Sequence, residues 1–115
     1  MNPYSQDDII AVATPPGIGA IAVIRISGKC LKKIFFSFTN KRPKDRYALF
    51  SKIYHPIKKH VLDEAIIIFY EAPKSFTGED VIEISCHGGS VVKKIIMDAA
   101  NDYGIRLAEP GEFSF

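Results

Sequence analysis

The most apolar stretch of the chain, residues 9–26, is interrupted by the tetrapeptide Thr14-Pro15-Pro16-Gly17. Two prolines and a glycine cannot continue a helix or strand, and they favour a tight turn. Arg25 lies inside the stretch and Asp7 and Asp8 precede it, which argues against a membrane span or a secretory signal sequence. The pattern instead predicts two short strands joined by a turn, in a soluble, cytoplasmic protein with no membrane partner.

Short apolar and β-branched runs bounded by turn residues recur along the rest of the chain. They predict strands at residues 9–13, 20–27, 61–70, 81–86 and 105–108. Residues 20–27 place Ala22, Ile24 and Ile26 on one face and are expected to form a buried strand. Residues 65–70 are apolar on both faces, so the second strand is expected to lie centrally in a sheet.

Two segments have the apolar spacing of a helix. Leu31, Ile34, Phe35 and Phe38 fall at i, i+3, i+4 and i+7. A second helix is expected to begin at a Ser90 cap and to stop at Gly104, with one side formed by Val91, Val92, Ile95, Ile96, Ala99 and Tyr103. The strand–helix–strand order at the end of the chain predicts a right-handed crossover between parallel neighbours. The fold class is therefore α+β, a single mixed sheet of about five strands with two or three helices.

The length and the cysteine content limit the remaining possibilities. A chain of 115 residues is expected to form one domain. Its two cysteines, Cys30 and Cys86, make neither a disulfide framework nor a four-ligand zinc site, so a reducing compartment and no metal are predicted.

Two charged residues interrupt apolar strands. Arg25 stands between Ile24 and Ile26, and Glu83 stands between Ile82 and Ile84. An unpaired buried charge costs several kcal/mol, so each must meet a partner, water or a ligand. One interpretation is a structural Arg–Glu pair across the sheet. The other is a binding site, in which the carboxylate accepts two parallel N–H bonds from a 2-amino-pyrimidinone edge and the Arg holds an anionic or carbonyl group.

Other polar residues carry weaker indications of chemistry. Cys86 and His87 are adjacent, but consecutive side chains of a strand point to opposite faces, so they cannot act as a nucleophile–base pair. Four loop carboxylates are expected to be solvated or to cap helices, and none forms an acid–base pair: Glu79, Asp80, Glu109 and Glu112. No catalytic residue is therefore predicted.

The charge distribution is uneven although the net charge is only +2. Residues 29–60 hold ten Lys or Arg and one acidic residue, Asp45. Such a segment can contact nucleic acid, or it can simply form a solvated face. An RNA-binding module is therefore one alternative function.

Several motifs together resemble the N-terminal region of the MnmE (TrmE) family of tRNA modification GTPases. In order, they are Ala13-Thr14-Pro15-Pro16-Gly17, Arg25-Ile26-Ser27-Gly28, Ser75-Phe76-Thr77-Gly78-Glu79-Asp80-Val81, Glu83-Ile84, His87-Gly88-Gly89 and Ala108-Glu109-Pro110-Gly111-Glu112-Phe113. The resemblance covers nearly the whole chain. It implies a fold similar to the folate-binding domain of the glycine-cleavage T protein and dimethylglycine oxidase.

The resemblance also implies a ligand and an assembly. A tetrahydrofolate derivative, similar to 5-formyltetrahydrofolate, is expected at the positions of Arg25 and Glu83. A folate-contacting Lys of the family falls beyond Phe115. Residues 1–115 are expected to be an N-terminal folate-binding and dimerisation domain that forms a homodimer. A purely structural dimerisation module with an internal Arg25–Glu83 pair is the alternative.

The family's helical and G domains are absent from these residues, so the chain is interpreted as a fragment that is not catalytic alone. By resemblance, the whole protein hydrolyses GTP with Mg and K on its G domain. It acts with the flavoprotein MnmG to form 5-carboxymethylaminomethyl-uridine at the tRNA wobble position.

Overall fold

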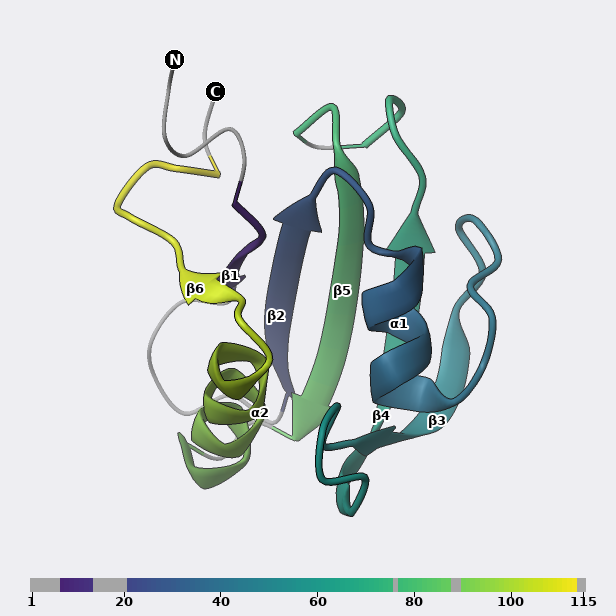
Figure 1. The fold of residues 1–115 in the computed structure, drawn as a ribbon, viewed down its shortest axis with the longest axis vertical. Coiled ribbons are helices and arrows are strands. Elements are labelled where there is room, and N and C mark those ends of the chain that lie inside the picture. The colour runs from purple at the N-terminus through teal and green to yellow at the C-terminus, as the bar shows by residue number, and fades with distance from the viewer. Residues whose placement is uncertain (1–6, 14–20, 76, 88–89, 114–115) are drawn as a thin grey trace.

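One mixed β-sheet with two helices beside it makes up the fold (Figure 1). The computed structural model describes residues 7–13, 21–75, 77–87 and 90–113. Within them the elements are β1 (Ile9–Val12), β2 (Ile21–Gly28), α1 (Lys32–Thr39), β3 (Leu49–Tyr54), β4 (Val61–Tyr70), β5 (Asp80–His87), α2 (Ser90–Asp102) and β6 (Arg106–Leu107). The described strands lie in the order β3-β4-β5-β2-β1-β6. The predicted α+β class is confirmed.

The sheet is antiparallel except at one edge. β3, β4, β5, β2 and β1 pair antiparallel in turn, and β6 pairs in parallel with β1. The expectation that β5 and β6 are neighbours is therefore wrong. Both edges of β5 are already taken by β4 and β2, so the chain leaving α2 reaches the next open edge, which is that of β1.

Alternation along the strands divides the sheet into a packed face and an open face. Both helices lie over the packed face, whose side chains form the core with them (Figure 1). The open face keeps large apolar side chains in contact with solvent: Ile21, Phe50 and Ile66 are 61%, 65% and 43% exposed. The predicted burial of β2 is wrong at Ile21, and the apolar open face of β4 is exposed at Ile66. β4 does lie inside the sheet, between β3 and β5.

Strand β3 is the element that the sequence pattern missed. Its inward positions include Ser51, which is 3% exposed, while its outward positions include the exposed Phe50. Because a small polar residue faces the core and an aromatic residue faces solvent, the usual apolar–polar alternation is weakened.

Helix α1 forms where the apolar spacing predicts it. Ile34, Phe35 and Phe38 are buried against the sheet, and Phe35 contacts Phe69 of β4 edge-to-face at 6.1 Å between ring centroids. The helix ends at Asn40, which adopts a left-handed conformation with φ of 59° and donates its N–H to the Phe36 carbonyl at 2.7 Å.

Helix α2 packs on a narrower face than predicted. Ile96, Ala99 and Ala100 are buried, whereas Val91 and Ile95 are 69% and 40% exposed. At roughly 100° per residue, Ile95 and Val91 lie about 100° and 140° around the helix axis from Ile96, which takes them off the core. Neither of the two described helices combines the length and apolar character needed to cross a bilayer.

Candidate functional site

Arg25 and Glu83 face each other on the open face, near the middle of the sheet. They are register partners on β2 and β5. Arg25 Nε donates a hydrogen bond to Glu83 Oε2 at 2.9 Å. The two side chains are 34% and 15% exposed. The direct pair of the structural interpretation thus forms, but it forms where solvent reaches it and not in a dry interior.

The Glu83 carboxylate uses one oxygen in this pair. Among the described residues, no hydrogen bond is formed to its Oε1. A carboxylate can accept bonds at both oxygens. Glu83 is therefore able to receive an N–H donor from a ligand at Oε1 while it keeps Arg25, or at both oxygens if Arg25 turns away.

Tyr70 and Arg46 extend this polar region, and neither was predicted from the sequence. Tyr70 lies on the same face as Ile68, the register partner of Glu83. Burial and the Glu83 carboxylate raise the pKa of Tyr70, while Arg25 and Arg46 act in the opposite direction. Arg46 lies over the Tyr70 ring, 5.4 Å from its centroid. The two-residue alternation of β4 was the signal that could have found Tyr70.

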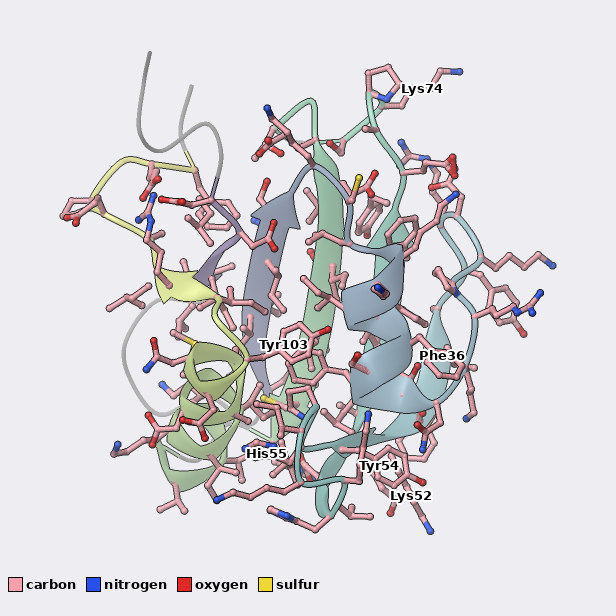
Figure 2. The ribbon with its side chains drawn as sticks, viewed as in Figure 1. Phe36, Lys52, Tyr54, His55, Lys74 and Tyr103 are labelled. Atoms are coloured by element: carbon pink, nitrogen blue, oxygen red, sulfur yellow. The ribbon has the colours of Figure 1, made fainter. Side chains whose placement is uncertain are left out.

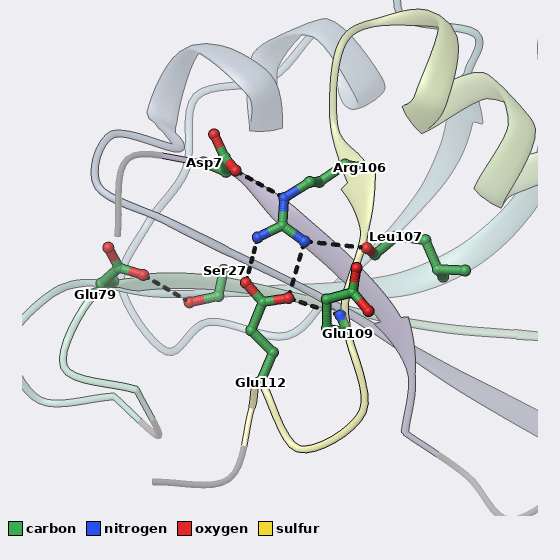
Figure 3. A network of polar contacts seen from close by, with 7 residues as sticks. All are labelled: Asp7, Ser27, Glu79, Arg106, Leu107, Glu109 and Glu112. Carbon is green, nitrogen blue, oxygen red and sulfur yellow. Dashed lines mark hydrogen bonds and ion pairs between the residues drawn. The ribbon is translucent and has the colours of Figure 1, made fainter. Parts of the chain in front are cut away.

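Ser27 connects β2 to the loop before β5. It is fully buried on the open face, two residues after Arg25. Its Oγ lies 2.7 Å from Thr77 Oγ1. It also donates to Glu79 Oε1 at 3.3 Å (Figure 3). Two of the motifs that are far apart in sequence are thereby held together beside the ion pair.

Gly28 ends β2 at a point of close approach. A Cβ placed there would come within 2.1 Å of Asp8 Oδ1 and 2.8 Å of Leu31 Cδ2. Burial, followed by the Glu79 and Asp7 carboxylates, raises the pKa of Asp8. A glycine at this position therefore leaves the room that the Asp8 side chain occupies.

Asp80 is buried, contrary to the expectation of a solvated loop carboxylate. Its Oδ2 accepts the Leu31 N–H at 3.1 Å, and its Oδ1 accepts the Ala72 N–H at 2.9 Å. The first contact caps the start of α1, as the capping alternative predicted. Asp80 joins β5, α1 and the loop after β4, and its role is structural.

Glu112 is likewise buried, and it binds Arg106 of β6 near the end of the described chain. Arg106 donates from its terminal nitrogens to both Glu112 oxygens and from Nε to Asp7 Oδ2 at 2.7 Å (Figure 3). Glu112 Oε1 also accepts the Glu109 N–H at 2.7 Å. These contacts fix the turn after β6, so the Glu109–Glu112 motif has a structural reason.

The stability of the chain is expected to fall in acid because Glu112 must ionise to hold Arg106. The bonds from Arg106, with that from the Glu109 N–H, lower the pKa of Glu112 from its ordinary value of 4.5. A lowered folded-state pKa gives stability that is present above the unfolded pKa and is lost as the pH falls through the folded value. Urea unfolding at a series of pH values below about 5 checks this.

Glu112→Gln is the matched comparison, since it keeps the shape and removes the titration. The raised pKa of Asp8 gives stability at low pH, which opposes the effect of Glu112. Asp8 is present in both the wild type and Glu112→Gln, so its effect cancels when the two pH profiles are subtracted. The pH dependence should be shallower in the variant. Parallel curves for the two proteins would contradict the assignment.

Cys86 and His87 lie on opposite faces of β5, as predicted. Cys86 is buried, its Sγ donates to the Ala22 carbonyl at 3.6 Å, and burial raises the pKa of the thiol. His87 is exposed and its Nδ1 lies 3.2 Å from Asp63 Oδ2. Within the described ranges, no group of three or more His, Cys, Asp or Glu could hold a metal ion. The turn at Gly88-Gly89, the Ser90 side chain and the turn at residues 14–17 lie outside the described part.

The comparisons identify similar proteins over nearly the full chain. The family described as "GTP-binding protein TrmE N-terminus" matches residues 8–115. A Francisella philomiragia protein named tRNA modification GTPase MnmE is 45% identical over 96% of this chain and 24% of that protein. Proteins of the same name from Aromatoleum aromaticum and Aliarcobacter butzleri are 46% and 44% identical, over 97% and 96% of this chain and 25% of each relative. The chain spans about a quarter of the length of these curated relatives.

Proposed function

Because the chain belongs to the TrmE N-terminal family, we propose that it is the tetrahydrofolate-binding and dimerisation domain of a tRNA modification GTPase. Arg25 and Glu83 are the proposed binding residues. The observation that supports them most is their position, side by side on the open face at 2.9 Å and within reach of solvent.

The chemistry of the two groups suits a folate. The pterin ring of a tetrahydrofolate presents N–H donors on one edge, which a carboxylate accepts in parallel. Glu83 supplies that carboxylate, and Oε1 carries no hydrogen bond from the described residues. Arg25 supplies a cation for a carbonyl or anionic group nearby. When bound, the folate would supply a one-carbon unit.

The open face also supports dimerisation. Ile21, Phe50 and Ile66 would all be buried if this face met a second copy, and apolar surface of this kind favours association. The proposed dimer contact and the proposed folate site at Arg25 and Glu83 therefore lie on the same face of the sheet.

The whole protein is proposed to act on tRNA. Its G domain, outside these residues, would bind GTP with Mg and K, and the flavoprotein MnmG would be its partner in forming 5-carboxymethylaminomethyl-uridine at the wobble position. We expect residues 1–115 to bind and assemble without catalysing a reaction, in the cytoplasm.

Calorimetry with 5-formyltetrahydrofolate tests the site. The wild-type chain is expected to bind weakly but measurably, and Glu83→Ala to bind at least about tenfold more weakly, because a charge-assisted acceptor is lost. Glu64→Ala is the matched control, since Glu64 is a β4 carboxylate on the same face, opposite Lys52 of β3. Equal affinity of the wild type and Glu83→Ala would remove Glu83 from the site.

The alternative is a purely structural dimerisation module in which Arg25 and Glu83 pair with each other. The direct hydrogen bond at 2.9 Å favours it. The two functions differ in one respect that can be measured: only a binding site requires a carboxylate at position 83 in particular, whereas a structural pair requires opposite charges in either order.

A further inference from the structure

Part of the basic segment lies around α1. All ten Lys and Arg side chains of residues 29–60 are exposed. Lys32 and Lys33 lie on α1, and Lys59 Nζ, from the β3–β4 turn, donates to the Ser37 carbonyl of the same helix at 3.3 Å. These three cations lie together at α1, whereas Lys52 lies opposite Glu64 on the open face of the sheet.

An open groove runs along this surface, away from Arg25 and Glu83. It has a volume of about 430 Å³ and lies between α1, the loop after it and the end of β4. Its cations are Lys32, Lys33 and Arg42, and Phe36 forms part of its wall. The volume is within the roughly 300–1,000 Å³ of small-ligand sites.

Two carboxylates, Asp45 and Glu71, also line the groove, and each has a partner of its own. Glu71 lies 3.7 Å from Lys32 Nζ, while Asp45 accepts the Glu71 N–H at 2.8 Å and lies 3.8 Å from Arg46 Nε. Among the described residues, neither Lys33 nor Arg42 forms an ion pair. The surplus positive charge of the groove therefore belongs to these two side chains.

Phe36 gives the groove a second property. It lies on the outer side of α1 (Figure 2) and is 48% exposed, although the preceding residue, Phe35, is buried. An exposed aromatic ring next to unpaired cations is the combination that binds single-stranded nucleic acid, because a base stacks on the ring while the cations contact phosphates. A cluster of cations alone would not distinguish RNA from other anions.

We propose that this groove binds an unpaired segment of RNA, with a base on Phe36 and its flanking phosphates at Lys33 and Arg42. The proposal deepens the proposed function, on which it rests, by giving the tRNA substrate of the whole protein a contact on this domain. It uses none of the residues of the folate site, so the RNA proposal and the folate proposal can be tested independently.

Fluorescence anisotropy with an unmodified tRNA transcript and a labelled 12-nucleotide single-stranded RNA tests the groove. Binding by the 115-residue chain is expected to weaken linearly in log–log form as salt rises from about 50 to 200 mM. Lys33→Gln/Arg42→Gln should lower that slope by roughly 1.4 to 2, since each phosphate contact contributes about 0.7 to 1. Phe36→Ala should weaken binding about fivefold or more at an unchanged slope.

Lys93→Gln/Lys94→Gln is the matched control, because it removes the same charge from α2, outside the groove. It should keep the wild-type slope. Equal slopes for the groove variant and the α2 variant, or binding to phosphatidylglycerol vesicles but not to RNA, would overturn the proposal. Calorimetry with 5-formyltetrahydrofolate on the same proteins shows whether the folate site stands independently of the result.

Discussion

Asp80→Ala is expected to lower the free energy of unfolding by about 3 kcal/mol, because it leaves two backbone N–H groups without their acceptor. Asp80 is 6% exposed and accepts from Leu31 at the start of α1 and from Ala72 in the loop after β4. The start of α1, the loop after β4 and the start of β5 lose their common contact at once. Urea denaturation followed by circular dichroism measures the change.

Asp80→Asn and a surface carboxylate provide the controls. Asparagine keeps one acceptor oxygen, so the loss should be smaller than for alanine. Asp98→Ala removes an exposed α2 carboxylate that forms an ion pair with Lys94, and its cost should stay within about 0.5 kcal/mol. If Asp80→Ala cost no more than Asp98→Ala, the buried contacts of Asp80 would not contribute to stability.

The fold was predictable wherever periodicity and burial agree. The helix at α1 follows from four apolar positions on one face, and the strand at β5 from a short β-branched run. β3 was missed because Ser51 faces inward and Phe50 outward, which reverses the usual pattern. The place of β6 could not be read from sequence, because it depends on which strand edge is still open when α2 ends.

From the sequence, Arg25 and Glu83 could each be identified as a candidate site residue, but their arrangement could not. A single charge in an apolar strand identified Arg25 and Glu83, since such a charge must be compensated. Their pairing depends on the register between β2 and β5, across 58 residues of sequence, which no local pattern encodes. Tyr70 and Asp80 were missed or misjudged for the same reason: their environments are created by segments that meet only in the folded chain.

Reversing one charge of the central pair should affect both stability and binding. Arg25→Glu places a carboxylate opposite Glu83, and unit charges about 4 Å apart repel by about 4 kcal/mol at an effective dielectric of about 20. Because Arg25 is 34% exposed, screening reduces the expected cost to about 2 kcal/mol. Affinity for 5-formyltetrahydrofolate should fall roughly 100-fold, because the ligand loses a cation and meets a second anion.

The exchanged variant Arg25→Glu/Glu83→Arg then separates a structural pair from a binding site. Opposite charges again face each other, so the free energy of unfolding should return to within about 0.5 kcal/mol of wild type. Affinity should not return, because a guanidinium at position 83 has no acceptor for the N–H edge of the ligand. Exchanging Lys52 and Glu64, register partners on the same face, should change neither quantity. Recovery of affinity together with stability would contradict the role of Glu83 as the ligand's acceptor, and failure to recover stability would contradict the pairing itself.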